Sequence, residues 1–534
     1  MASELVSRRV AAALLAAAVS ACAGIRGDDG GSATPGGFAG SPGFAGATGQ
    51  PGGPAGGGAG RPPETENESR YLAPIATGKY LWTANPLSGR VALIDATTLQ
   101  VTLETAGDRP TQVIGLPDLG AGIGALVLNE RSDDATLFRI DDSGRVQKLP
   151  RLRTHRSANA WTASPSGRVA IAWADAARFE RAPDPLETLQ DITLFSVVPG
   201  AEAVFPLSIG RRPSAFAFSE DERIAYAVTE EGINVISLGS EPEVTELIPL
   251  VDDPFADPAA LDVGFATGAA YAVVRAEGAS HFEIVELPSG ARERVELGDV
   301  ITDVDLSPEG DRAIAVLGVA GALVAVPVPA AGADPATFER AELGSAEFGA
   351  VALNADASVA VVYSTVTGTS RVRLIETSFA AAASRSYDLV SPVSAVFAAP
   401  DPRFAVVFQR PPSNSQKAGA FSLLSLSAPL APKVVATDAA PNALAFAPDG
   451  SSALVAVRSD ERELYGAYVV RLERQQVDFI ELASPPLSAG VITAVDTGYV
   501  AQAHPEGRIT FISLRDGAAR TVTGFELAAR IVSR

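Results

Sequence analysis

Apolar and polar residues alternate along most of this chain with the period of two that is typical of β-strands. The clearest unit is segment 441–457, in which an alternating apolar strand leads into the turn Pro448-Asp449-Gly450 and then into a second apolar strand. Asp and Gly favour such a turn because Asp bonds to nearby backbone and Gly tolerates positive φ. One hairpin cannot bury both of its faces, so the pattern predicts many hairpins packed side by side.

The hairpin recurs about ten times at a spacing of mostly about 43 to 48 residues, in or just above the range of four-stranded propeller blades. A third alternating strand follows each hairpin, as in 232–238, and a more polar fourth strand ends the unit, as in 291–297. No stretch after residue 70 has a sustained helical period. The predicted turns lie at 76–84, 117–120, 164–172, 219–227, 265–272, 307–310, 354–357, 399–402, 447–450 and 495–498.

These repeats predict an all-β fold, a β-propeller of four-stranded antiparallel blades. One large ring is favoured, and a ring with degenerate blades or two smaller rings stay open as alternatives. The first repeat has no evident inner strand before Ala76, whereas the final segment 525–532 is a strand with no hairpin after it. We therefore expect the C-terminal strand to complete the first blade and close the ring, which removes an exposed sheet edge. The alternative is a trailing edge strand.

The repeats also resemble known propeller families. Segment 79–86 followed by 90–95 is similar to the YVTN-type repeat, in which an aromatic-Val-Thr-Asn strand precedes a Val-Ile-Asp strand. The turns of the Ser-Pro-Asp-Gly kind resemble those of WD-repeat-like and TolB-type propellers. The resemblance covers nearly everything after residue 70 and implies the fold, but it leaves the function open because propellers have many activities. The full YVTN-like pattern occurs once, and ten repeats exceed the usual number of blades.

The N-terminus reads as a targeting segment. Two arginines at 8–9 precede a short apolar run at 10–19, and residues 19–22 are Val-Ser-Ala-Cys. This resembles the lipobox of bacterial lipoproteins, whose cysteine is linked to diacylglycerol and whose signal is cleaved just before it. The resemblance implies cleavage between Ala21 and Cys22, with the lipid on Cys22. The alternative is an ordinary secretory signal with an incidental cysteine.

Domain boundaries follow from these features: a signal peptide at 1–21, a Gly/Pro/Ala-rich disordered tether at 22–70 and the propeller at 71–534. The tether composition leaves too little apolar area to offset the entropy of ordering. Cys22 is the only cysteine, so it cannot form an internal disulfide. The lipobox implies a bacterial cell envelope. Ala23 is not the aspartate that retains some lipoproteins at the inner membrane, so the outer membrane or cell surface is favoured.

The composition narrows the classes of partner. A formal charge of −21 disfavours a nucleic-acid binder, which needs a basic face against phosphates. His155, His281 and His504 lie far apart in the sequence and suggest no metal site. Asp303 and Asp305 alternate on one strand and are interpreted as partly solvated polar positions in preference to a calcium site. The sequence therefore predicts no metal, cofactor or catalytic site.

Three longer segments point to a binding face. Insertions at 175–191, 410–418 and 459–466 lie between the second and third strands of their units, so a propeller would present them on one face with the loops that join the units. The candidate binding residues are Arg178, Phe179, Arg181, Arg410 and Tyr465. Sequence drift in unconstrained loops is the alternative. Trp161 and Trp173 lie in apolar strand patterns and are expected in the core.

The predicted function is that of a non-catalytic, membrane-anchored propeller lipoprotein. It would contact the bilayer through acylated Cys22 and bind a protein or glycan of the cell envelope. The alternative is a periplasmic or surface enzyme, because some propellers of this broad kind are lactonases or cyclases with Glu, His or Arg in the central channel. No motif of this chain matches theirs.

Overall fold

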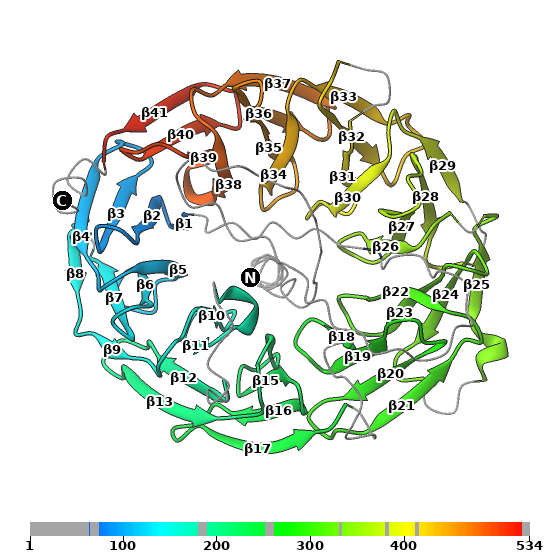
Figure 1. The fold of residues 1–534 in the computed structure, drawn as a ribbon, viewed down its shortest axis with the longest axis horizontal. Coiled ribbons are helices and arrows are strands. Elements are labelled where there is room, and N and C mark those ends of the chain that lie inside the picture. Colours follow the sequence, from blue (N-terminus) through cyan, green and yellow to red (C-terminus); the bar gives the residue numbers. More distant parts are fainter. Residues whose placement is uncertain are drawn as a thin grey trace, which may run out of the picture.

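The computed structural model describes residues 64, 74–141, 143–179, 189–250, 261–330, 334–345, 347–379, 384–411 and 416–525. Within them the chain forms ten antiparallel sheets that follow one another around a single ring (Figure 1). Each sheet is a meander of consecutive strands that runs from the axis of the ring to its rim. The predicted β-propeller of four-stranded blades is confirmed, and so is the single large ring.

The first five blades run from residue 75 to residue 296. Their strands are β1 Ile75–Thr77, β2 Tyr80–Asn85, β3 Arg90–Asp95 and β4 Val101–Thr105; β5 Pro110–Leu116, β6 Gly124–Asn129, β7 Asp134–Ile140 and β8 Val146–Lys148, with a short β9 Leu152–Arg153 that also pairs with β7; β10 Ala160–Ala163, β11 Val169–Trp173, β12 Asp191–Ser196 and β13 Ala203–Ser208; β14 Ala215–Phe218, β15 Ile224–Thr229, β16 Gly232–Ser237 and β17 Glu243–Ile248; and β18 Leu261–Phe265, β19 Tyr271–Ala276, β20 His281–Glu286 and β21 Arg292–Glu296.

The last five blades run from residue 301 to residue 523. Their strands are β22 Ile301–Leu306, β23 Arg312–Leu317, β24 Ala322–Pro327 and β25 Glu339–Glu342; β26 Ala350–Leu353, β27 Val359–Tyr363, β28 Arg371–Glu376 and β29 Arg385–Asp388; β30 Val393–Ala398, β31 Phe404–Gln409, β32 Gly419–Ser425 and β33 Lys433–Thr437; β34 Ala440–Phe446, β35 Ser452–Ser459, β36 Leu464–Arg471 and β37 Gln476–Glu481; and β38 Pro486–Ile492, β39 Thr497–Gln502, β40 Arg508–Ser513 and β41 Ala519–Thr523.

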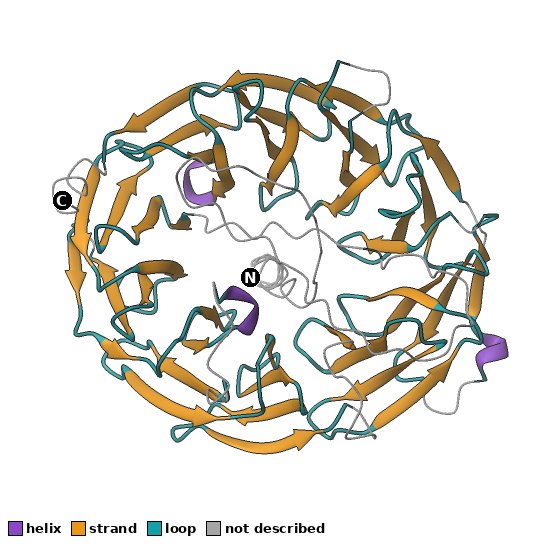
Figure 2. Ribbon diagram, viewed as in Figure 1, coloured by secondary structure: helices purple, strands orange, loops and turns teal. Residues whose placement is uncertain are grey.

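Helical structure within the described ranges is confined to three single turns of 3-10 helix (Figure 2). They are η1 Ala176–Arg178, η3 Pro335–Thr337 and η4 Thr493–Val495. None of the helices in this part of the chain has the length and apolar character needed to cross a membrane.

The ten predicted hairpin turns all join the first and second strands of a blade. In the tightest of them the N–H of the fourth residue donates to the carbonyl of the first, as from Gly450 to Ala447 at 2.8 Å. The fourth residue has a positive φ, which glycine adopts without strain, and φ is 66° at Gly450. Ala357 and Glu222 occupy the same place with φ of 51° and 54°. The local hydrogen bond therefore holds the turn even where the glycine is absent.

The core lies in the second and third strands of the blades, because these strands pack against the neighbouring blades on both faces. All six residues of β31 are buried, whereas β4 at the rim has mostly exposed residues. The buried side chains are mainly Ala, Val, Leu and Ile, in clusters that join adjacent blades. Trp161 and Trp173 belong to one such cluster, as predicted.

The prediction about the closing strand is wrong. The inner position of the first blade is filled by β1, which pairs with β2 in the register Ile75↔Trp82 and Thr77↔Tyr80. Among the described strands, the first and last blades are therefore each built from one continuous segment and share no strand. Phe525 is described and packs at the contact between these two blades, and the rest of segment 525–532 lies outside the described residues.

Side chains close the ring instead. Leu81 and Ile94 of the first blade pack against Ile492 and Phe511 of the last blade. The hydroxyl of Tyr499 on β39 donates a hydrogen bond to the backbone carbonyl of Pro74, just before β1. Burial raises the pKa of Tyr499 above its ordinary value, so this hydroxyl keeps its proton at neutral pH.

We predict that Tyr499→Phe weakens this closure. The change removes the donor and leaves the buried carbonyl of Pro74 without it, which costs about 1–3 kcal/mol of unfolding free energy. Urea unfolding measured by tryptophan fluorescence would show this loss. Tyr226→Phe, at an equally buried tyrosine in the fourth blade, is the control. An equal loss in the two variants would contradict a special role for the Tyr499 hydroxyl.

Candidate binding face

Two kinds of connection between strands lie on the same face of the ring. In a four-stranded meander, the link between the second and third strands lies at the same end as the link to the next blade. The strand order of all ten blades has this form. We call this side the loop face, and the side with the Pro-Asp-Gly type turns is opposite to it. The three segments expected as insertions therefore all begin and end on the loop face.

The three insertions differ in kind. Segment 175–190 is a long connection between β11 and β12 and contains η1. Segment 410–418 is a shorter connection between β31 and β32. The third is not an extended loop, because β35 continues to Ser459 and β36 begins at Leu464, leaving only residues 460–463 as a turn. Cross-strand pairing absorbs most of the expected insertion.

Arg178 is exposed on η1, but its guanidinium is already engaged. Its Nε lies 3.2 Å from a carboxylate oxygen of Asp175, and its Nη1 donates to the carbonyl of Asn159. Asp175 also accepts a hydrogen bond from Ala177 N at the start of η1. Phe179 follows η1 and is half-buried. Arg181 lies outside the described residues.

The other two candidates lie in neighbouring blades. Arg410 follows β31, and its Nη2 donates to the carbonyl of Thr365 in the preceding blade. Tyr465 lies on β36 opposite Arg458. Burial and the negative charges of Asp460 and Glu463 raise the pKa of Tyr465. Arg178 lies in the third blade, on the other side of the ring from the eighth and ninth (Figure 1), so the structure does not bring the candidates into one site.

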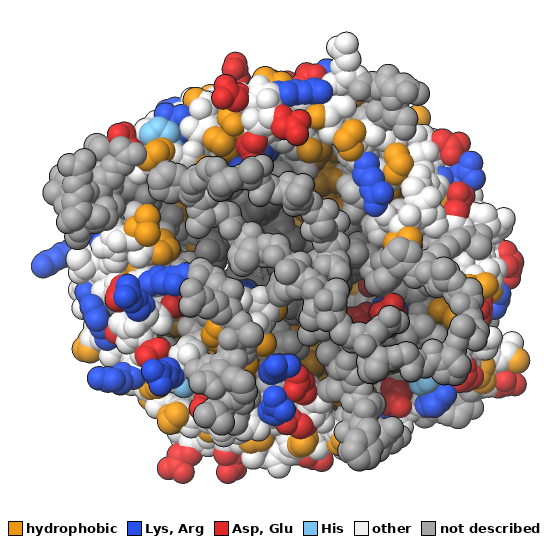
Figure 3. Space-filling model, viewed as in Figure 1, with side chains coloured by type: hydrophobic (Ala, Val, Ile, Leu, Met, Phe, Trp, Pro, Cys, Tyr) orange, Lys and Arg blue, Asp and Glu red, His pale blue; other side chains and the backbone are white. Residues whose placement is uncertain are grey.

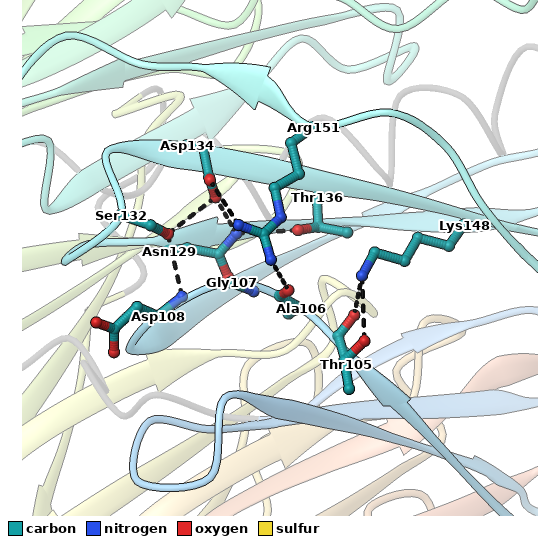
Figure 4. Close-up of polar contacts among 10 residues, drawn as sticks. All are labelled: Thr105, Ala106, Gly107, Asp108, Asn129, Ser132, Asp134, Thr136, Lys148 and Arg151. Atoms are coloured by element: carbon teal, nitrogen blue, oxygen red, sulfur yellow. Dashed lines mark hydrogen bonds and ion pairs between the residues drawn. The ribbon is translucent and has the colours of Figure 1, made fainter.

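A buried polar network lies on the loop face between the first and second blades (Figure 4). Asn129, at the end of β6, is fully buried and its Oδ1 accepts a hydrogen bond from Gly107 N at 2.9 Å. Its Nδ2 donates to Asp134 Oδ1 at 2.7 Å and to Thr136 Oγ1 at 3.0 Å. Ser132 Oγ donates to the same oxygen of Asp134. The amide of Asn129 therefore joins the inter-blade link to the β6–β7 hairpin.

Cations complete this network. Arg151 Nη1 lies 3.3 Å from Asp134 Oδ2, and Arg151 Nη2 donates to the carbonyl of Ala106 at 2.9 Å. Lys148 Nζ donates to the carbonyl and hydroxyl oxygens of Thr105 (Figure 4). These bonds satisfy the carbonyl groups of the link and neutralise Asp134. The network therefore serves to position the loop face.

The fourth blade repeats the arrangement. Gly210 N donates to Asn234 Oδ1 at 3.2 Å, and Asn234 Nδ2 donates to Thr229 Oγ1. Both links have the sequence Gly-x-Arg-Pro, at 107–110 and at 210–213, and the arginine has a positive φ in each. This short repeat is the signal that could have located these networks from the sequence, but the hairpin pattern does not include it.

Near the axis, two aspartates on β22 reach the inner strand of the next blade. Asp303 Oδ2 accepts a hydrogen bond from Val351 N at 2.7 Å, and Asp305 Oδ2 accepts one from Leu353 N at 3.3 Å. Both donors belong to β26, whose axis-facing edge has no strand partner. The two carboxylates therefore cap an open sheet edge.

Asp303 is not the partly solvated position that the sequence suggested, whereas Asp305 is half-buried. Asp303 is only 8% exposed. Burial raises its pKa to about 6, although the charge of Arg275 and the bond from Val351 oppose the rise. Burial and the neighbouring charge of Asp303 raise the pKa of Asp305 well above its ordinary value. Arg275 itself donates to Asp262 Oδ2 at 2.9 Å, which makes three carboxylates and one cation near the axis.

The described part of the chain contains no group of three or more His, Cys, Asp or Glu side chains placed to hold a metal ion. Basic and acidic side chains are interspersed around the rim of the visible face (Figure 3). Ion pairs join Arg371 to Asp388 and Lys417 to Asp438. Paired surface charges of this kind contribute little to stability.

Comparison with known proteins assigns no family or function to the chain. No protein-family model matches the chain, and no curated protein sequence matches it. Solved structures do match, among them a eukaryotic initiation factor at 12% identity, covering 82% of this chain and 94% of that one with a TM-score of 0.48.

Two further matches are to proteins whose descriptions name enzymes. Dihydro-heme d1 dehydrogenase NirN matches at 11% identity, covering 76% of this chain and 73% of that one with a TM-score of 0.42. Hydrazine synthase of Kuenenia stuttgartiensis matches at 12% identity, covering 86% and 97% with a TM-score of 0.32. Likeness at these levels carries no functional argument, and the ten-bladed ring rests on the strand order of this chain itself.

We predict that Gly107→Ala disrupts the network of Figure 4. A Cβ at this position would lie 2.5 Å from Asn129 Cγ and 2.6 Å from Ser132 Oγ, so the buried amide must move. The expected cost is about 1–3 kcal/mol of unfolding free energy, measured by denaturant unfolding. The control is Gly239→Ala, where the nearest atom is 3.9 Å away and the expected change is within about 0.5 kcal/mol. Equal stability of the two variants would contradict the tight packing.

We also predict that Asp303 makes stability depend on pH. Its pKa rises from 3.8 to about 6 on folding, so between these values the folded protein holds a proton that the unfolded chain releases. The contribution of this group is therefore full below pH 3.8 and is lost as the pH rises through 6.

Thermal unfolding of the wild type and of Asp303→Asn across this range would measure the effect. The melting temperature of the wild type should fall relative to that of the variant as the pH rises. Asp356→Asn, at an exposed turn aspartate, is the control for the loss of one carboxylate. A constant difference between the wild type and Asp303→Asn across this pH range would contradict the prediction.

Proposed function

We propose that this protein is a membrane-anchored, non-catalytic binding or scaffold module of the bacterial cell envelope. The observation that carries the proposal is the loop face, where connections of very different length stand on one side of a rigid ring. They range from the two-residue turn at 230–231 to the long segment 175–190. Variable connections on a rigid scaffold are the usual place for recognition.

The anchor is proposed from the sequence alone. The lipobox-like residues 19–22 lie outside the described residues, and Cys22 is the residue that would receive the lipid. Several acyl chains hold a protein stably at a membrane, whereas one chain binds marginally. The Gly-rich segment 22–70 would then separate the ring from the bilayer. We also propose that the repeats are related to the YVTN-type and TolB-type propeller repeats that they resemble.

The proposed partner is a protein or glycan of the envelope. Arg178 and Arg410 are exposed on the loop face. Arginine is enriched at the energetic centres of interfaces, where it can bond with several acceptors at once. The formal charge of −21 disfavours nucleic acid as the partner.

A lactonase or cyclase type of enzyme is the second candidate. The observation in its favour is the convergence of Asp262, Asp303 and Asp305 with Arg275 near the axis. It ranks second because Asp303 and Asp305 already accept hydrogen bonds from backbone N–H groups of β26. A general acid or base needs its carboxyl within reach of a substrate.

We predict that Cys22→Ala releases the protein from the membrane. The variant lacks the thiol that would carry the lipid, so it should incorporate no labelled palmitate and should move to the soluble fraction. Ser20→Ala, which keeps a small residue before the cysteine, is the control and should stay membrane-bound. Unchanged palmitate labelling and membrane retention of Cys22→Ala would refute the anchor.

The same envelope preparations test binding. Affinity capture with the wild type should recover a partner that an Arg178→Ala, Arg410→Ala double variant recovers at least tenfold less, with Arg223→Ala as the control. Arg223 lies at a hairpin turn on the opposite face. Recovery of the same partner by all three proteins would place the interaction away from the loop face.

A further inference from the structure

Glu64 is the one described residue before Pro74, and its side chain binds the seventh blade. Ser364 Oγ donates to Glu64 Oε1 at 2.6 Å. Thr365 N and Thr365 Oγ1 both donate to Glu64 Oε2, at 2.6 and 2.8 Å. Both carboxylate oxygens are therefore bonded, one of them twice. Bonds to an ionised acceptor are among the strong ones in proteins.

The donors are fixed by their own surroundings. Ser364 and Thr365 directly follow β27 on the loop face, and they are 0% and 7% exposed. Val366 N and Thr367 N donate to Ser364 Oγ at 3.2 and 3.1 Å. A hydroxyl has one hydrogen and two acceptor positions, so these bonds leave the hydrogen of Ser364 for the carboxylate. Hydrogen bonds within the loop itself therefore help to orient the donors that bind Glu64.

Arg410 supports the same loop from the next blade. Its guanidinium donates to the carbonyl of Thr365, the residue whose N–H and hydroxyl bind Glu64. This bond helps to hold Thr365 in place. Arg410, which the sequence selected only as part of an insertion, is therefore a positioning residue of this site.

A glycine provides the space that the carboxylate fills. A Cβ on Gly349 would lie 2.4 Å from Glu64 Oε1 and 2.9 Å from its Cδ and Cγ. The φ of Gly349 is not in the left-handed region, so alanine there is excluded by the carboxylate and not by backbone strain. Gly349 N donates to the carbonyl of Tyr363, which holds this backbone in place.

Glu64 binds the seventh blade, although it is close in sequence to the first blade. It precedes Pro74 by ten residues, and Pro74 lies at the start of the first blade. Ten residues span at most about 35 Å when extended. A chain residue held this near to a site acts at an effective concentration in the millimolar range. Glu64 therefore competes strongly with any free ligand of the same chemistry.

We propose that Gly349, Ser364 and Thr365 form a carboxylate-binding site for an acidic side chain of a peptide, and that Glu64 is its internal occupant. With Glu64 bound, residue 64 is held against the loop face. A peptide from a partner that places its own carboxylate in the site displaces Glu64. Glu64 therefore occupies the site until an acidic peptide replaces it. The inference does not depend on the membrane anchor.

The test uses the full chain and a fluorescent synthetic peptide with the sequence of residues 61–67, Arg-Pro-Pro-Glu-Thr-Glu-Asn. Fluorescence anisotropy should show that the peptide binds Glu64→Gln at least tenfold more tightly than the wild type, because the internal competitor is weakened. A control peptide with Gln in place of the first Glu should bind Glu64→Gln at least tenfold more weakly than the original peptide.

Two further variants keep the test decisive. Gly349→Ala in the Glu64→Gln background fills the space, and Thr365→Val removes one hydroxyl donor while it keeps the backbone and side-chain volume. Each should lower peptide affinity at least tenfold, with folding checked by circular dichroism. Equal peptide binding to the wild type and Glu64→Gln would overturn the proposal. Full binding by either folded site variant would overturn it too.

Discussion

The ring depends on satisfying the open edge of each inner strand. That strand has a partner on one side only, so its backbone groups on the axis side need other partners. Within the described residues, six hydrogen bonds join a side chain of one blade to the inner strand of the next blade or to the residue just before it. These bonds are Gln112 to the Asn159 carbonyl, Arg275 to the Ile301 carbonyl, Val351 N to Asp303, Leu353 N to Asp305, Asn442 to the Pro486 carbonyl and Tyr499 to the Pro74 carbonyl. The bonds always run to the next blade, so they align the blades as well as pairing their edges.

Much of the fold could be predicted because the hairpin is a local structure. Its turn needs a hydrogen bond between residues three positions apart, and it needs one residue with a positive φ. Gly450 is a residue that adopts a positive φ without strain. Period-two alternation then marks the flanking strands, so the blades and their order followed from the sequence. The closing strand did not, because β1 has only three residues, too few to show a period. The extended hairpin of β35 and β36 was also missed, because the pairing of polar residues such as Arg458 with Tyr465 has no apolar signature.

The candidate site was less accessible to sequence reasoning, because its contacts join residues that are remote in the chain. Ser364 and Glu64 are 300 positions apart, and no pattern near either one indicates the other. Gly349 differs from the turn glycines. The turn glycines adopt a positive φ, whereas glycine is needed at 349 because a side chain there would collide with Glu64. The alternating pattern placed Asp303 on the correct strand. It could not show whether the carboxylate contacts water or a backbone N–H group of the next blade. The insertions did indicate the correct face, and Arg410 is the one selected residue with a contact to the Glu64 site.

Each blade is made of one uninterrupted stretch of chain, including the two that meet at the seam. In a ring whose ends exchange a strand, adding or losing a unit must preserve that exchange. Here a gene segment encoding one blade could be duplicated or deleted without leaving a half-built sheet at either terminus. Only the side-chain packing around Leu81 and Phe511, with the bond from Tyr499, would need to re-form at a new angle. The number of blades in such a lineage can therefore change by single whole units, which offers a route to a ring as large as this one.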